Sequence, residues 1–174
     1  MELIKAKSIA ETIVTALKPH CSRIEVAGSI RRGKPFVHDI DIVAIPNNQG
    51  QFLYTLQQLG QVHGGKKILQ LMYLTGFSGI VADIYIATPE IWATLLLIRT
   101  GSAAHNIMLC KRARSMGMTL HVDGTGLERV KDAQGNGLGI FDGHKAGGEY
   151  LPCATEADIF KALGLPYKSP MERE

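Results

Sequence analysis

Two aspartates separated by one residue, Asp39 and Asp41, begin a stretch whose alternating apolar residues indicate an extended strand. Side chains at positions i and i+2 of a strand point to the same face, so these carboxylates should project together. Two bare carboxylates so placed repel each other unless a positive charge lies between them. Mg²⁺ is bound by one or two carboxylates together with substrate phosphates, which makes this pair a candidate metal site.

A small-residue turn with two arginines, Gly28-Ser29-Ile30-Arg31-Arg32-Gly33, lies just before the acid pair. We expect Ser29 at a helix N-terminus, where free N–H groups and the helix dipole favour phosphate. Arg32 would add bidentate, charge-assisted contacts to the same phosphates. A phosphate-binding turn beside metal-binding acids indicates nucleotidyl transfer.

A third acid, Asp83, lies in the middle of an apolar strand pattern, where an unpaired carboxylate is costly to bury. If this strand lies beside that of Asp39 and Asp41, three carboxylates converge and can hold two Mg²⁺ ions, for which Mn²⁺ can substitute. Two such metals stabilise the attacking and leaving oxygens of an in-line phosphoryl displacement. The three aspartates are therefore the predicted catalytic and metal-binding residues.

The elements that must position these acids follow from the hydrophobic spacing and from the turn residues. The pattern predicts helices over residues 3–18, 51–59, 89–98, 102–116 and 155–163, and strands over 23–27, 39–45, 66–74 and 81–87. Ser102 is the expected N-cap of its helix. Short strands and loops are expected over residues 118–150, and residues 169–174 are expected to form an exposed tail.

Composition is that of an ordinary globular protein of one domain or two small ones, with 174 residues and 45% hydrophobic content. No apolar run is long enough to span a membrane, and the N-terminus lacks a signal peptide, so we expect an intracellular location in the cytoplasm or nucleoid. Three scattered cysteines are expected to be free thiols in a reducing compartment.

Positive charge gathers between Glu90 and Asp123, where no acidic residue occurs. A basic segment of this kind suits a polyanion. We expect its four basic side chains to contact the phosphates of a nucleic acid: Arg99, Lys111, Arg112 and Arg114.

Four separated motifs, taken together, resemble the family X DNA polymerases of the nucleotidyltransferase superfamily. They are Gly28–Gly33 with Asp39-Ile40-Asp41, then Thr100-Gly101-Ser102-x-x-His105-Asn106, Leu163-Gly164-Leu165-Pro166-Tyr167, and Met171-Glu172-Arg173-Glu174. The resemblance implies an α+β fold with a nucleotidyltransferase palm of mixed sheet at residues 1–89. It also implies a small α+β thumb at residues 90–174. Because the chain starts where the palm starts, the family's N-terminal lyase domain is not expected.

The resemblance also implies a reaction, in which a dNTP is added to a primer 3′-hydroxyl on gapped or primer–template DNA, as in repair. It assigns the three aspartates to metal binding. The sequence itself gives no sign of an oligomer interface, so we expect a monomer. Nucleotide contacts are implied for seven residues: Ser29, Arg32, His38, Thr100, Gly101, Ser102 and Asn106.

The sequence departs from the family pattern at several positions. Ile98-Arg99 stands where many members have Tyr-Phe, and Cys110 stands where an arginine packs under the templating base. Two alternatives therefore stay open. One is a template-independent terminal transferase, or a nucleotidyltransferase acting on RNA or a small molecule. The other is a non-catalytic DNA-binding accessory protein.

Overall fold

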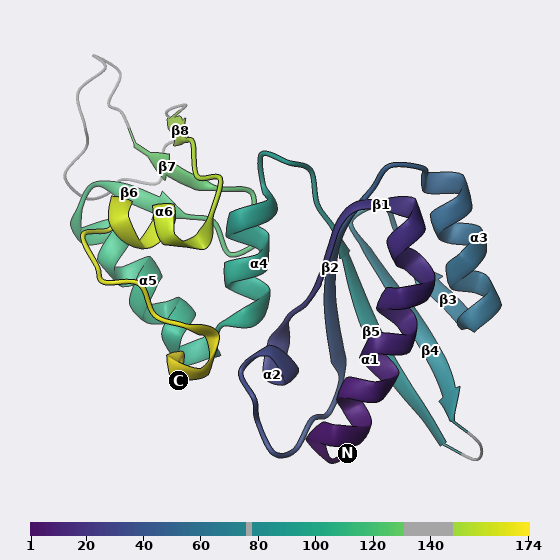
Figure 1. Cartoon of the computed structure of the whole chain (residues 1–174). Coiled ribbons are helices and arrows are strands. Elements are labelled where there is room, and N and C mark those ends of the chain that lie inside the picture. Colours follow the sequence, from purple (N-terminus) through teal and green to yellow (C-terminus); the bar gives the residue numbers. More distant parts are fainter. Residues whose placement is uncertain (76–77, 131–147) are drawn as a thin grey trace. The chain divides into compact units, whose positions relative to one another are not determined.

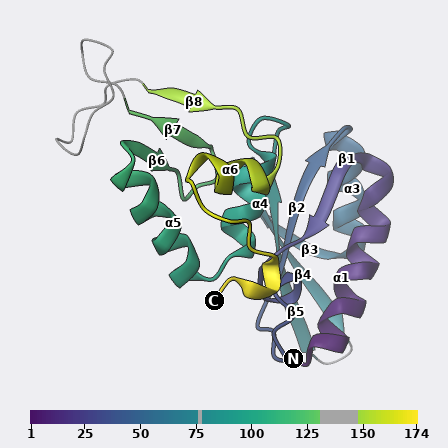
Figure 2. The ribbon, with the colours of Figure 1, turned by 60° about the vertical axis from the view of Figure 1, so that its left-hand side comes forward.

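The computed structural model describes residues 1–75, 78–130 and 148–174. The chain forms two compact units, Met1–Thr88 and Pro89–Glu174, and each is described below by itself (Figures 1 and 2). Among the helices of the described ranges, none combines the length and the apolar content that crossing a membrane requires.

A five-stranded mixed sheet in the order β1-β2-β5-β4-β3 is the centre of the first unit. Its strands are β1 (Cys21–Val26), β2 (Ile40–Pro46), β3 (Gly60–Gly64), β4 (Ile68–Thr75) and β5 (Ser78–Ile86). Only β2 and β5 pair in parallel, and the other neighbours are antiparallel. The expected α+β fold with a mixed sheet is confirmed.

Helices cover one face of this sheet. They are α1 (Leu3–Leu17) and α3 (Gln49–Leu59), which lie on the same side of the sheet in Figure 1. The buried positions of α1 recur at helical spacing and pack against the alternate β2 residues Ile40 and Ile42. Because strand side chains alternate between faces, Asp41 projects from the face opposite to these helices.

The second unit has its own core, built from three main helices and a three-stranded antiparallel sheet in the order β6-β7-β8. Its elements are α4 (Trp92–Thr100), α5 (Ala103–Ser115), β6 (Met118–Leu120), β7 (Leu127–Arg129), β8 (Glu149–Leu151) and α6 (Glu156–Ala162). Ser102 Oγ accepts a 3.0 Å hydrogen bond from the His105 N–H, so the predicted N-cap of α5 is confirmed. Figure 2 shows α5 and α6 beside this small sheet.

Most elements begin or end one to three residues away from the predicted bounds, and two differences have a physical reason. Strand β3 was not predicted, because Gly60, His63 and Gly64 give its sequence little strand propensity. Its extended conformation is instead stabilised by antiparallel pairing with β4. Helix α4 begins at Trp92 and not at Pro89, since the first helical bond runs from the Leu95 N–H to the Ile91 carbonyl. Residues 131–147 of the expected loop region lie outside the described residues.

The C-terminal residues are not the predicted exposed tail. A 3₁₀ turn, η2 (Pro170–Glu172), is closed by a reciprocal cap in which Ser169 and Glu172 bond each other's backbone N–H groups. Arg173 follows this turn and is completely buried. The prediction failed because the hydrophilic composition of this segment gives no sign of a partner elsewhere in the chain.

Candidate functional site

Asp41 of β2 and Asp83 of β5 are direct neighbours across the one parallel pairing of the sheet. Residues paired in register point to the same face, so both carboxylates project from the face that α1 and α3 leave uncovered. Both residues are half-buried. The register thus places the strand of Asp83 beside that of Asp41, which is the condition that the predicted convergence required.

Asp39 lies just before β2, at an exposed bend. Among the described residues, no group of three or more acidic, histidine or cysteine side chains is placed to hold a metal ion. Asp39 therefore does not join the pair of Asp41 and Asp83 in this structure, and the site of three carboxylates stays a prediction. The donor chemistry nevertheless fits Mg²⁺, which prefers carboxylate and phosphate oxygens over nitrogen or sulfur ligands.

Neutral donors occupy one oxygen of each paired acid. The Tyr85 hydroxyl donates to Asp41 Oδ1 over 3.2 Å, and the Gln70 amide Nε2 donates to Asp83 Oδ1 over 2.9 Å. Sequence reasoning missed both contacts. Gln70 belongs to β4, and only the register of β4 on β5 reveals that it lies opposite Asp83.

Gly28 is the point at which the predicted phosphate turn meets Asp41. Its φ of +59° lies in the left-handed region that favours glycine, and a Cβ at this position would overlap Asp41 Oδ2. The Ala27 N–H donates to the Asp41 carbonyl over 2.8 Å, which fixes the turn on β2. The one-turn helix α2 (Gly28–Arg31) starts here, so Ser29 lies in its first turn as expected.

Replacing this glycine should therefore disturb the acid pair. We expect Gly28→Ala to lower the rate of the predicted nucleotidyl transfer at least about tenfold, because the new methyl group displaces the Asp41 carboxylate and strains the backbone by about 1–2 kcal/mol. Steady-state primer extension checks this. Gly65→Ala is the control, since a Cβ there meets open space, and equal activities of the two variants would contradict the expectation.

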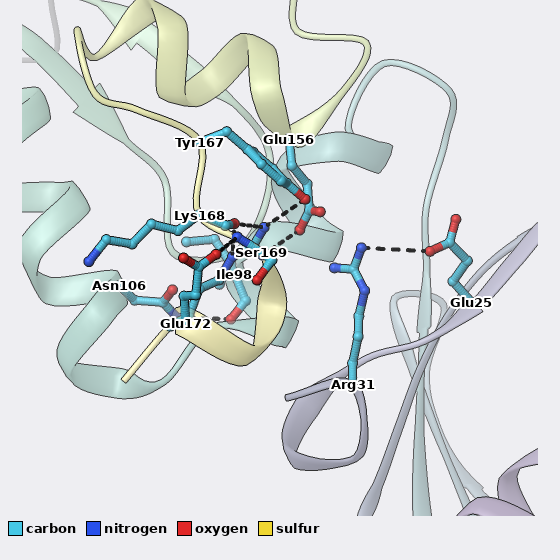
Figure 3. Close-up of polar contacts among 10 residues, drawn as sticks. Glu25, Arg31, Ile98, Asn106, Glu156, Tyr167, Lys168, Ser169 and Glu172 are labelled. Carbon is cyan, nitrogen blue, oxygen red and sulfur yellow. Dashed lines mark hydrogen bonds and ion pairs between the residues drawn. The ribbon is translucent and has the colours of Figure 1, made fainter. Parts of the chain in front are cut away.

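The other polar side chains of the turn, and His38 just after it, differ in burial and in their partners. Ser29 Oγ is buried and has no hydrogen-bond partner in the part of the chain that the structure describes, which fits an absent ligand oxygen. Arg31 lies 3.8 Å from Glu25, an ion pair drawn in Figure 3. Arg32 is half-buried, and His38 is exposed beside Asp39.

The second predicted nucleotide segment joins α4 to α5. Thr100 is fully buried at the end of α4, and a Cβ on Gly101 would lie 2.5 Å from Asn106 Oδ1. The Asn106 Nδ2 donates to the Ile98 carbonyl over 2.8 Å, as Figure 3 shows. Within the described residues Asn106 Oδ1 is buried without a partner. The amide is therefore held in one orientation by the backbone.

The buried side chain of Arg173 joins several residues of the second unit through an ion pair, hydrogen bonds and ring contacts. Its guanidinium makes a 2.7 Å ion pair with Glu156, and two further bonds reach the Lys168 carbonyl at 2.9 and 3.0 Å (Figure 3). It also stacks over the rings of Phe160 and Tyr167 at 5.5 and 5.6 Å. The buried charge is thereby both paired and hydrogen-bonded.

His105 packs against the same cluster, with its ring centroid 5.8 Å from that of Phe160. The side chain is only 2% exposed, and neither ring nitrogen has a partner among the described residues. Burial, assisted by the positive charges of Arg173 and Lys168, lowers the pKa of His105 to about 4, although Glu156 opposes the shift. His105 is therefore a neutral packing residue at pH 7.

The lowered pKa of His105 should make the free energy of unfolding depend on pH. An unfolded histidine has a pKa of about 6.5, so between that value and about 4 the unfolded chain binds more protons, and stability falls as pH falls. We expect His105 to account for about 3 kcal/mol of lost stability between pH 7 and pH 4. Urea unfolding of the wild type and of His105→Phe should show a smaller decrease in the variant; equal decreases would contradict this role.

The four predicted DNA-binding residues are not equivalent. Lys111 and Arg114 are exposed on α5, whereas Arg99 is half-buried on α4. Arg112 Nε donates to the Leu163 carbonyl over 2.8 Å, near the end of α6. Arg112 thus has a structural contact that sequence reasoning missed, and Lys111 and Arg114 are the better candidates for phosphate contacts.

Comparisons of the sequence and of the structure with known proteins all find DNA polymerases of the beta and lambda type. A family model described as DNA polymerase beta thumb matches residues 95–174. DNA polymerase lambda of Rattus norvegicus is 33% identical over 166 residues, a match that covers 84% of this chain and 28% of that protein. The chain therefore spans less than a third of the length of this relative.

A solved structure extends the likeness to the whole chain at the level of fold. The Leishmania infantum polymerase beta structure, a ternary P/T complex, superposes with a TM-score of 0.77 at 19% identity. The match covers 100% of this chain and 76% of that one. Both described units therefore have counterparts in one known fold.

Proposed function

This chain belongs to the family X DNA polymerases, and on that premise we propose that it adds deoxynucleotides from dNTPs to a primer 3′-hydroxyl in gapped or primer–template DNA. In this reaction the 3′-oxygen forms a bond to the α-phosphorus, and the bond from that phosphorus to the β-phosphate bridging oxygen breaks. Pyrophosphate leaves, and the hydroxyl proton is lost. Residues 1–89 would act as the palm and residues 90–174 as the thumb.

The observation that carries the proposal is the in-register pair Asp41 and Asp83, which lies against the Gly28-Ser29 turn. Two Mg²⁺ ions held by Asp39, Asp41 and Asp83 would supply charge stabilisation for the entering and leaving oxygens. Ser29 Oγ would donate to a triphosphate oxygen, for which its missing partner leaves it available. Arg32 would neutralise charge on the same group.

The second unit would hold the rest of the nucleotide and the DNA. The backbone at Thr100 and Gly101 would lie along the sugar of the incoming nucleotide, with Ser102 beside them. The Asn106 amide, fixed by the Ile98 carbonyl, would contact the minor-groove edge of the incoming base. His38 would lie near the triphosphate, and Lys111 and Arg114 would contact DNA phosphates without reading sequence.

Primer extension tests the proposed function. The protein and Mg²⁺ are supplied with a one-nucleotide gap, a recessed primer and a single strand in parallel, and with each dNTP and NTP separately. We expect addition of mainly the complementary dNTP on the two templated substrates. Indifferent addition to the single strand would instead indicate a terminal transferase. No addition on any substrate, with metal binding retained, would indicate an accessory DNA-binding role.

DNA binding should depend steeply on salt. Each phosphate contact contributes roughly 0.9 to the slope of log affinity against log salt concentration, so Lys111→Ala is expected to reduce that slope by about 1. Fluorescence anisotropy with a labelled gapped duplex at several salt concentrations measures it. Lys7→Ala on α1 is the matched control, because Lys7 is also exposed but belongs to a helix that covers the face of the first unit's sheet opposite to Asp41. An unchanged slope in the Lys111 variant would remove it from the DNA contacts.

A further inference from the structure

We propose that Gln70 is a positioning residue for Asp83: its amide holds one carboxylate oxygen so that the other is presented on the face shared with Asp41. This inference rests on the proposed function, in which Asp83 binds a catalytic metal. Gln70 itself touches neither the nucleotide nor the metal in this scheme. It acts through Asp83 alone.

The sheet register places Gln70 where this role is possible. Antiparallel pairing sets Gln70 of β4 opposite Asp83 of β5, and parallel pairing sets Asp83 opposite Asp41 of β2. The row continues on β3, where His63 is opposite Gln70. Four polar side chains thus follow one line across four strands, and the two acids form its end on β5 and β2.

The hydrogen bond from Gln70 fixes the orientation of the Asp83 carboxylate. Gln70 Nε2 donates to Asp83 Oδ1 over 2.9 Å, a normal length for a bond to a carboxylate. A half-buried carboxylate has a broad torsional well about its terminal bond, so without a partner its two oxygens can exchange places. One fixed donor removes that freedom and leaves Oδ2 as the oxygen that faces away from β4.

The chemistry of the donor is suited to a metal site. A lysine or arginine at position 70 would also donate to Asp83, but its positive charge would repel a divalent cation nearby. The amide of Gln70 orients the carboxylate and leaves its negative charge available to the metal. Asp41 has an equivalent neutral partner, since the Tyr85 hydroxyl donates to its Oδ1. The two acids therefore share one arrangement, in which Oδ1 is held by the protein.

The test compares Gln70→Met with His63→Met in the full chain. Methionine keeps the length of glutamine but cannot donate, so Gln70→Met removes the hydrogen bond with little change in volume. His63→Met makes the same polar-to-apolar change on the next strand of the same row, where the side chain is also exposed. Thermal unfolding of both variants gives their stability.

Two readouts separate positioning from a structural role. In primer extension with Mg²⁺ we expect Gln70→Met to lower kcat about tenfold with an unchanged KM for dNTP, since a hydrogen bond to a charged group is worth about that factor. In electron paramagnetic resonance with Mn²⁺ alone, the same variant should bind Mn²⁺ more weakly, on the order of threefold to tenfold. His63→Met should resemble the wild type in both measurements.

Failure of this inference can be told apart from failure of the proposed function. If the wild type extends primers and Gln70→Met matches it in kcat and in Mn²⁺ affinity, Gln70 has no positioning role, although the polymerase assignment stands. If both variants lose activity and melting temperature together, the effect is structural and the inference is overturned. If the wild type neither extends a primer nor binds Mn²⁺, the proposed function itself fails, and this inference fails with it.

Discussion

Asp83→Asn is expected to lower kcat for primer extension by about 10³-fold or more while the fold survives. The amide oxygen still accepts the hydrogen bond from Gln70, so the shape of the site is kept. The negative charge is lost, and with it several kcal/mol of the stabilisation that a metal held there would give to the transition state. Single-turnover extension of a recessed primer measures the loss, and circular dichroism checks the fold.

The control for this variant is Asp123→Asn in the second unit. Asp123 Oδ1 accepts from the Thr125 N–H and hydroxyl in a local turn, and an asparagine oxygen can accept the same bonds. We expect its activity to remain within about twofold of the wild type, as is usual for surface substitutions. Extension by folded Asp83→Asn within about tenfold of the wild type would contradict a metal-binding role for Asp83.

Arg173→Met should destabilise the second unit by about 3–5 kcal/mol. The substitution leaves the Glu156 carboxylate buried, at 8% exposure, without its guanidinium. It also removes the stacking over Phe160 and Tyr167. Urea unfolding followed by fluorescence measures this unit selectively, because the one tryptophan of the chain, Trp92, is buried in it.

Two further variants test whether the effect comes from an uncompensated charge. Arg129→Met, an exposed arginine on β7, should change stability by less than about 0.5 kcal/mol. Adding Glu156→Leu to Arg173→Met should recover part of the loss, because no charge is then buried alone. A double variant that is no more stable than Arg173→Met alone would show that packing, and not the unpaired Glu156 charge, dominates.

The sequence predicted what depends on short-range patterns. Caps such as Ser102 involve groups three residues apart, which a local pattern can predict. The expected shared face of Asp39 and Asp41 required both residues to lie in one strand, but β2 begins at Ile40 and Asp39 lies at a bend before it. The mixed α+β fold followed from the family motifs. The roles assigned to the individual site residues stay predictions.

The contacts that sequence reasoning missed join residues far apart in the chain. The partner of Asp83 is Gln70, which belongs to the next strand and is selected by a register that no local pattern specifies. The partner of Arg173 is Glu156, and each of these residues alone resembles a solvated surface charge. Arg112 has a bond to the Leu163 carbonyl that its place in a basic segment does not reveal, and its predicted DNA contact stays a prediction. Such pairings are fixed only when the whole unit is packed.

The burial of Arg173 bears on the order in which the chain folds as it is synthesised. All residues of the first unit lie before Pro89, so its sheet can close as soon as that segment has left the ribosome. The second unit must wait for a residue 85 positions after Thr88, since Glu156 has no counter-charge until Arg173 emerges. At about 5–20 residues per second this delay is roughly 4–17 s. During that interval a formed first unit would be joined to an incomplete second unit, whose apolar core residues would be open to aggregation or to binding by a chaperone.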